Sequence, residues 1–248
     1  MAQTKLSIAV ASMIRGSVRN MRASRYRFRL LLDCALLSAM LMLMSYPLTR
    51  GLLLHGQCGC AFLVLLLLHH IVNNHWYRSL FGRWHKKRIV LNCMDILLLL
   101  ATALMVISAL FMAGEVFTVF PYAMPWWARG LHMSANAWLF VLVSCHLGLH
   151  GAQWWEKTQR TFQRLFGRAW WTIPLGIMGL GAWRFIDSGL WVDMFFWGHA
   201  RYVPETLPLF LMDCAVISLA WAFLARCLQQ WAFCGWGRKG DPRQLRNV

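Results

Sequence analysis

Six histidines of this chain lie in apolar stretches, where they could serve as ligands to a metal ion or to haem iron. Of the nine histidines in the sequence, these six are His55, His69, His70, His132, His146 and His150. Ionisable side chains are costly inside a membrane, so each histidine placed there invites a functional explanation. Neutral imidazole is a good ligand for haem iron and for several other transition metals. The residue type and its apolar surroundings therefore predict a cofactor or metal site.

The spacing of four of these histidines is regular. His55 and His69 are 14 residues apart. The same interval of 14 residues separates His132 from His146. This interval equals two heptads, so both members of a pair lie on one face of a helix in a left-handed bundle. At a rise of about 1.5 Å per residue they lie about 21 Å apart along the helix, as two haems stacked through a membrane require.

The segments that carry these histidines belong to a chain too apolar for an aqueous fold. Hydrophobic residues make up 59% of its 248 residues and charged residues 14%, against about 45–50% and about 25% in soluble domains. A transmembrane helix needs roughly 20 mainly apolar residues. Such stretches lie at residues 30–48, 52–72, 90–112, 131–153, 169–185 and 207–228. We therefore expect an all-α polytopic membrane bundle of about six transmembrane helices, with the short apolar stretch 190–197 at the membrane interface.

The net charge of +16 indicates orientation in a membrane and not a nucleic-acid partner, because the basic residues lie between the apolar stretches. All Lys and Arg except Arg50, Arg129, Arg184 and Arg201 lie in four segments: residues 1–29, 73–89, 154–168 and 226–246. The positive-inside rule places these four segments in the cytoplasm. The even number of spans agrees with that placement. We expect a multi-pass protein of the cell inner membrane, with a transmembrane domain at 30–228 between cytoplasmic basic tails at 1–29 and 229–248.

The N-terminal tail leaves two interpretations open. Its segment SVRNMRASRYRFR could form a basic helix on the lipid surface, or the tail could be disordered.

In this orientation the second and fourth spans run parallel, which pairs their histidines by depth. His55 and His132 form an outer pair, and His69 and His146 form an inner pair. Each pair predicts a bis-histidine haem site, since bundle cores build cofactor sites from facing helices. Two neighbours, His70 and His150, could replace the inner ligands or bind a haem propionate. A histidine-rich proton path, a metal site or packing histidines without ligands are the alternatives.

Residues around these pairs give weaker signals. Gly59 lies one turn after His55 on the same face and could let a flat macrocycle approach the backbone, although small residues also serve ordinary helix packing. Arg50 and Arg129 lie just outside the outer pair and could hold haem propionates. Three carboxylates in or near the spans could serve proton uptake at a quinone site or pair with nearby arginines. They are Asp33, Asp95 and Asp213.

The stretches HGQCGCAFLVLLLLHHIVNNHWYRSLFGRW and LHMSANAWLFVLVSCHLGLH resemble the flavinylation-associated cytochrome family of small cytochrome b-like membrane proteins. The histidine interval on alternate helices is also similar to that of the respiratory cytochrome b superfamily. This resemblance covers about the middle half of the chain and implies a four-helix core with two non-covalent b-type haems. It also implies an electron-transfer role beside an extracytoplasmic flavin-bearing protein. The fifth and sixth spans match no motif and leave the partner open.

Three functions remain in competition. The first is an electron conduit between a quinol or cytoplasmic-side donor and an extracytoplasmic redox partner. The second is a self-contained quinol or metal reductase, and the third is a non-redox scaffold subunit of a larger complex. The sequence contains no Walker motif and no CxxCH motif for covalent haem. The absence of a soluble catalytic domain favours an electron-transfer subunit over an enzyme, and the paired histidines favour it over a scaffold.

Overall fold

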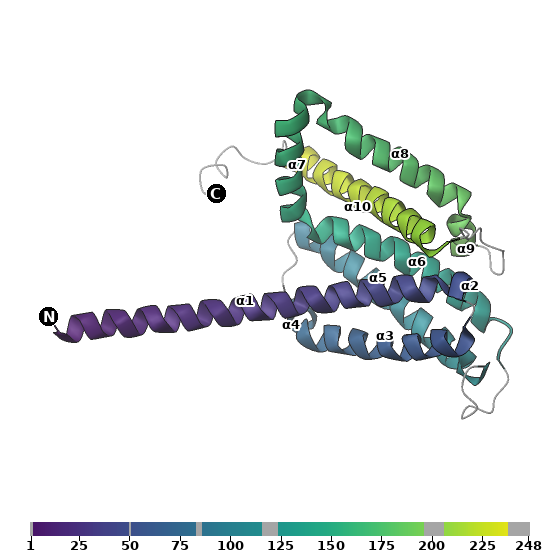
Figure 1. Cartoon of the computed structure of the whole chain (residues 1–248), viewed down its shortest axis with the longest axis horizontal. Helices are drawn as coiled ribbons and strands as arrows, with labels where there is room; N and C mark the ends of the chain where they lie inside the picture. Colours follow the sequence, from purple (N-terminus) through teal and green to yellow (C-terminus); the bar gives the residue numbers. More distant parts are fainter. Residues whose placement is uncertain (1, 50, 83–85, 116–123, 196–205, 238–248) are drawn as a thin grey trace.

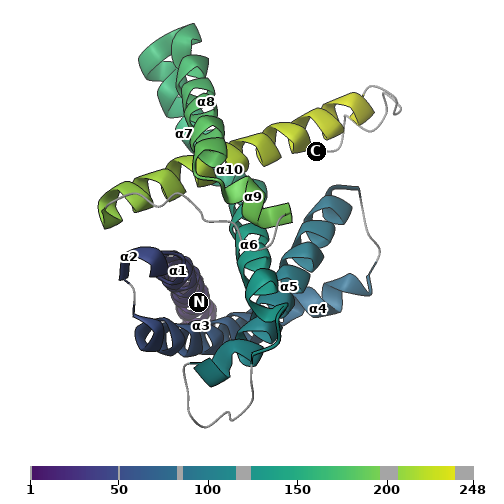
Figure 2. The same cartoon turned by 90° about the vertical axis from the view of Figure 1, so that its right-hand side faces the viewer.

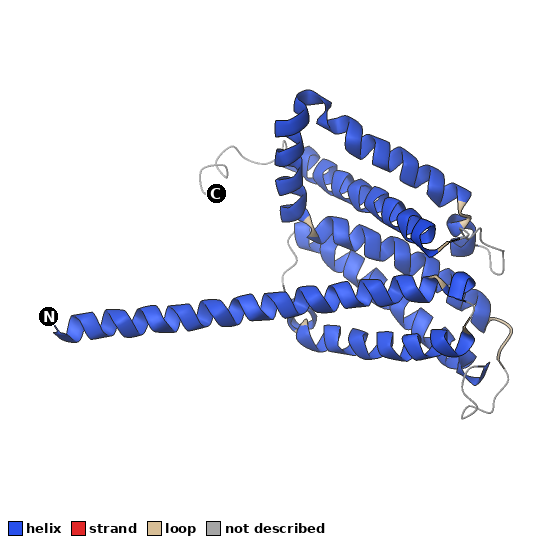
Figure 3. Ribbon diagram, viewed as in Figure 1, coloured by secondary structure: helices blue, strands red, loops and turns tan. Residues whose placement is uncertain are grey.

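Every regular element in the described part of the chain is helical, as the apolar composition predicts (Figure 3). The structure is a computed structural model of the 248-residue chain, and it describes residues 2–49, 51–82, 86–115, 124–195 and 206–237. Four of the described helices are long and apolar enough to cross a membrane. They are α3 (Leu52–Val72), α5 (Lys86–Met112), α6 (Ala128–His150) and α10 (Leu207–Gly237). These four correspond to the second, third, fourth and sixth predicted spans.

The first predicted span is part of a much longer helix. Helix α1 (Ala2–Met44) has 43 residues, which gives a length of about 65 Å. Its N-terminal half extends beyond the other helices, and its C-terminal half packs along α3 (Figure 1). The basic tail is therefore helical and continuous with the apolar segment that follows Arg29. Only the residues from there to Met44 are mainly apolar, which is shorter than the roughly 20 residues of a full span.

The α-helix of the fifth predicted span begins three residues later than expected. A 3-10 helix, η2 (Gly167–Trp171), occupies its beginning, and α8 (Thr172–Asp187) has 16 residues. Gly189 ends this helix in a left-handed conformation with φ of 69°, which glycine adopts without steric cost. Helix α8 packs closely along α10, because a Cβ at Gly181 would come within 2.7 Å of the Val216 carbonyl oxygen.

Two shorter helices connect these long elements. Helix α7 (Ala152–Phe166) lies at a steep angle to α8 and α10 (Figure 1) and exposes the basic side chains of Lys157, Arg160 and Arg164. Helix α9 (Leu190–Phe195) is the apolar stretch that is too short to span. It packs on α6, where the Ser134 hydroxyl donates a hydrogen bond of 2.8 Å to the Asp193 carbonyl.

Helix α6 lies at the centre of the fold, between α5 and α10 (Figure 2). Its buried side chains include Ala137, Leu139 and Phe140, which belong to the main hydrophobic core. Helix α3 is peripheral: within the described residues, Phe62 is its one buried side chain. The two helices that carry the six histidines therefore differ in surroundings. Helix α6 is held by protein on several sides, while α3 packs mainly along α1.

One end of the bundle collects the basic connections, and we call it the basic end. There α3 ends and the short helix α4 (His75–Leu80) follows it, while α5 begins at Lys86. Helix α7 lies across this end, and both described chain ends extend from it (Figure 1). The structure thus gathers the described parts of the predicted cytoplasmic segments at one end.

Candidate functional site

The outer pair of histidines, His55 and His132, is brought together across α3 and α6. Their ring centres lie 6.3 Å apart, with 72° between the ring planes. An iron held by two imidazoles, with metal–nitrogen bonds of about 2 Å, would have ring centres about 6 Å apart. This spacing therefore fits one metal between the two rings. Because the residues lie on different helices, tertiary packing creates the pair, as the parallel arrangement predicts.

The hydrogen bonds of His132 leave one ring nitrogen available. Its Nδ1 lies 3.3 Å from the Ser108 hydroxyl oxygen, which comes from α5. That hydroxyl donates its single hydrogen to the Met105 carbonyl at 2.8 Å, so towards His132 it can only accept. The hydrogen of the imidazole therefore lies on Nδ1, and Nε2 keeps the lone pair that binds a metal. Polar partners of this kind fix the tautomer of ligating histidines in metalloproteins.

His55 is held on the side of α1 and α2 (Tyr46–Thr49). Its ring packs edge-on against Tyr46, with the ring centres 5.2 Å apart, and it hydrogen-bonds the backbone at Leu43. The glycine one turn later, Gly59, has open space beside it: a Cβ added there would meet no atom within 4 Å. Ordinary helix packing therefore does not explain Gly59. It does explain Gly148, where a Cβ would collide with the backbone of Ala222 on α10.

The structure describes one of the two arginines that were predicted beside the outer pair. Arg129 lies exposed in the first turn of α6, three residues before His132. Arg50 lies outside the described residues.

His69 of the inner pair contacts a carboxylate on α1. Its Nδ1 lies 2.9 Å from Oδ1 of Asp33 and 3.4 Å from the side-chain amide of Asn73. The neighbouring His70 turns elsewhere, with its Nδ1 2.9 Å from the Tyr77 hydroxyl. The Nε2 atom of His69 is therefore the ring nitrogen that these polar contacts leave available.

His146, the other member of the inner pair, contacts a carboxylate on α5. Its Nδ1 lies 2.9 Å from Oδ1 of Asp95, and Nε2 of His150 lies 3.6 Å from the same oxygen. The ligand atoms of these three residues all lie within 4.8 Å of one another. Two histidines and one carboxylate form a donor set that suits non-haem iron or zinc. The two imidazoles are the polar neighbours of a carboxylate in an apolar helix, although Oδ1 of Asp95 and Nδ1 of His146 make no hydrogen bond in the described residues.

The inner pair itself is not joined by a ring contact in the part of the chain that the structure describes. Each member is tied to the carboxylate of a neighbouring helix instead. The expectation that carboxylates in the spans pair with arginine holds for Asp213, which makes two charge-assisted hydrogen bonds to Arg184. It is wrong for Asp33 and Asp95, because the nearest helix offers each of them an imidazole. In the sequence, the contacts of Asp33 and Asp95 with histidine are indicated only by the position of both aspartates near the predicted membrane depth of the inner histidines.

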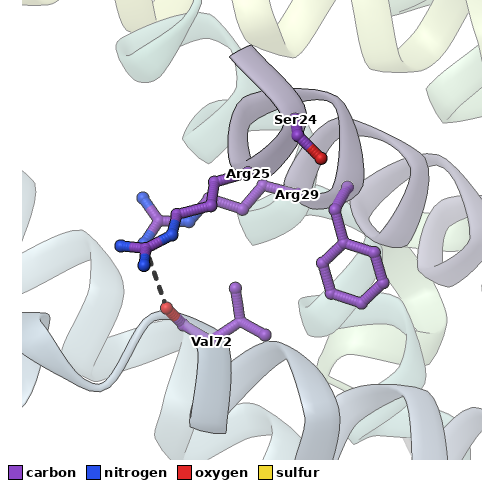
Figure 4. A pocket seen from close by; sticks show the side chains of 5 residues that line it. Ser24, Arg25, Arg29 and Val72 are labelled. Carbon is purple, nitrogen blue, oxygen red and sulfur yellow. Dashed lines mark hydrogen bonds between the residues drawn. The ribbon is translucent and has the colours of Figure 1, made fainter. Parts of the chain in front are cut away.

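A cavity of about 460 Å³ opens at the basic end between α1 and α3. Ser24, Arg25, Phe28, Arg29 and Val72 line it (Figure 4). The Arg29 guanidinium donates a hydrogen bond of 3.1 Å to the Val72 carbonyl. This arginine therefore hydrogen-bonds a carbonyl in the last turn of α3, where its positive charge also interacts favourably with the negative end of the helix dipole.

The donor chemistry of both pairs suits non-covalent haem. In the outer pair the ring spacing fits, and in the inner pair the contacts at Nδ1 leave Nε2 available on both rings. The fold adds a multi-pass membrane architecture with four candidate membrane-spanning helices in its described part. Comparisons of the chain with protein-family models, curated proteins and solved structures found no match.

Proposed function

We propose that this chain is a membrane cytochrome that holds two b-type haems and carries electrons across the bilayer. The observation that carries the proposal is the outer pair, whose rings from two separate helices lie 6.3 Å apart. The hydrogen bonds of His132 leave its Nε2 as the free ligand atom. The resemblance to flavinylation-associated cytochromes, and the equal histidine intervals on α3 and α6, support the same function.

For the inner haem we propose His69 and His146 as the ligands. Each has a carboxylate oxygen 2.9 Å from its Nδ1, which favours Nε2 as the atom that would bind iron. His150 instead directs its Nε2 towards Asp95, which makes it the weaker candidate. His70 follows His69 by one residue, so it lies about 100° further around the helix and off the face that carries His55.

The haems would supply reversible one-electron chemistry at iron, and the chain supplies their position. His55 and His69 lie about 21 Å apart along α3. In a hydrocarbon core about 30 Å thick, one site would therefore lie towards each membrane surface. Arg129 is exposed at the outer end, and we propose that it would hold a haem propionate. Beside Gly59 the open space on α3 leaves room for a flat macrocycle.

We propose six transmembrane helices in the cell inner membrane, with both termini on the cytoplasmic side. The four long apolar helices are completed by α1 and α8, which run alongside α3 and α10 (Figure 1). The basic end then faces the cytoplasm by the positive-inside rule. In this orientation His69 and His146 would hold the haem nearer to a quinol or cytoplasmic-side electron donor, and His55 and His132 would hold the haem nearer to an extracytoplasmic redox protein such as a flavoprotein.

One observation favours a second candidate at the inner site. The cluster of Asp95, His146 and His150 offers three ligand atoms to a single metal ion without any help from α3. A zinc or non-haem iron site there would leave one haem per chain, at the outer pair. The two candidates differ in metal content and in the role of His69.

The test is haem and metal content after expression with adequate haem supply and purification in detergent. The proposal expects a b-type α-band on reduction and pyridine haemochrome approaching two haems per chain. A folded but colourless protein would contradict it. One haem per chain, with one zinc or iron lost on His150→Ala but retained on His69→Ala, would favour the second candidate. The matched variant His70→Ala should leave the haem content unchanged in either case.

A further inference from the structure

We infer that Asp33 and Asp95 are positioning residues of the inner haem, which orient its two axial histidines and lower its reduction potential relative to the outer haem. This inference rests on the proposed function and concerns the same inner pair. It identifies a task for two carboxylates that otherwise lie in a costly environment.

The two carboxylates approach their histidines at the same distance although they come from different helices. Asp33 on α1 approaches Nδ1 of His69 at 2.9 Å, and Asp95 on α5 approaches Nδ1 of His146 at the same distance. In both contacts the ring atom is Nδ1, so in both Nε2 is left for iron. The Asp33 contact has hydrogen-bond geometry, whereas Oδ1 of Asp95 and Nδ1 of His146 lie at ion-pair distance without a hydrogen bond between them. A carboxylate oxygen at the same distance from Nδ1 of each histidine suggests a common role for the two carboxylates.

A carboxylate at Nδ1 changes what the imidazole does at its other nitrogen. It holds the hydrogen on Nδ1, fixes the orientation of the ring and raises the basicity of Nε2. A more strongly donating axial ligand favours the oxidised iron, which lowers the reduction potential. The outer His132 instead has neutral partners, which are the Ser108 hydroxyl at the longer distance of 3.3 Å and the backbone carbonyl of Met105. The inner haem is therefore the one with the lower potential.

The two carboxylates are not equally strong in this role. The Asp95 side chain is 13% exposed, whereas that of Asp33 is 50% exposed. Solvent screens the exposed carboxylate more, so its effect on the ring is smaller. The expected order of effects is therefore Asp95 first and Asp33 second.

The experiment is a redox titration of the purified holoprotein with the isosteric neutral variants Asp95→Asn and Asp33→Asn. Asp187→Asn is the matched control, because Asp187 pairs with Arg184 on α8, far from the inner pair along the chain. We expect two haems in each variant and a rise in the potential of the inner component only. For Asp95→Asn the redox equilibrium should shift about tenfold, which is about 59 mV for one electron. Asp33→Asn should give a smaller rise, and the control none.

The electron paramagnetic resonance spectrum of the oxidised protein gives a second readout that loss of stability alone would not move. The low-spin signal of one haem should change in both variants, and Asp95→Glu should restore it. If Asp95→Asn loses the inner haem altogether, its role in holding the ligand is supported and Asp33→Asn decides the effect on potential. Two retained haems with unchanged potentials in both variants would overturn the inference while leaving the proposed function intact. A parent protein without haem would instead overturn the proposed function.

Discussion

Replacing His55 with alanine should remove the outer haem and leave the inner haem in place. The reason is geometric, because the two ligands on α3 are separated by 14 residues, or about 21 Å along the axis. One iron cannot be shared over that distance when the two imidazoles of a single site need ring centres about 6 Å apart. His132→Ala should have the same effect as His55→Ala, since its ring lies 6.3 Å from that of His55.

The size of the effect follows from this division into two sites. Each outer variant should lose about half of the haem measured by pyridine haemochrome, and its redox titration should fit one component where the parent needs two. The inner variants His69→Ala and His146→Ala should lose the complementary component. Fold retention is checked by circular dichroism, since α6 is held mainly by α5 and α10 and not by its histidines.

A particular outcome would refute this reasoning. If His55→Ala and His69→Ala abolish the same spectral component, the two sites are not stacked along α3. If His69→Ala is silent and His70→Ala removes the inner component, the stacked arrangement stands and the ligand assignment is wrong.

Three further predictions concern the surroundings of the site. Gly59→Phe should lower the haem content of a folded protein by filling the open space on α3, and a haem content equal to that of the parent would contradict this prediction. Gly148→Ala should lower thermal stability in detergent, because the added Cβ would force α6 away from α10. Asp213→Ala should destabilise by roughly 1–3 kcal/mol because the half-buried Arg184 loses two charge-assisted hydrogen bonds while its ion pair with Asp187 remains, and replacing both residues by apolar ones should recover most of the loss in thermal unfolding. Reporter fusions at Met124 should report the side opposite to both termini, and a shared side would invert the topology.

Much of the site could be predicted from residue types and intervals. The 14-residue interval occurs on both histidine-bearing helices, and with the predicted parallel orientation it paired His55 with His132. The rings of these two residues do lie side by side in the structure. The contact of Asp95 with His146 depends on the neighbourhood of α5 and α6, which no local pattern contains. For the same reason the close packing of Gly148 on α10 could not be separated from a role beside a cofactor until the helices were placed.

Helix boundaries were predicted less well than helix existence. Hydropathy changes sharply after Arg29, and this change reports the surrounding solvent, not the backbone conformation. The residues on both sides of it are good helix formers, so α1 continues through the predicted boundary without a break. The fifth span begins later than predicted, because Gly167, with φ of 55°, ends α7 and η2 follows it.

The continuity of α1 links its exposed half mechanically to the inner histidines. Asp33 lies one turn beyond Arg29 in the same uninterrupted helix, and its carboxylate touches His69. A helix transmits rotation about its axis along its length, and a turn by one residue's angle of about 100° would carry Asp33 away from that ring. A partner that binds the protruding part of α1, about 32 Å of helix from Ala2 to Ala23, would therefore also set the orientation of the Asp33 carboxylate. Rotation of the protruding part of α1 about the helix axis would therefore also move the Asp33 carboxylate.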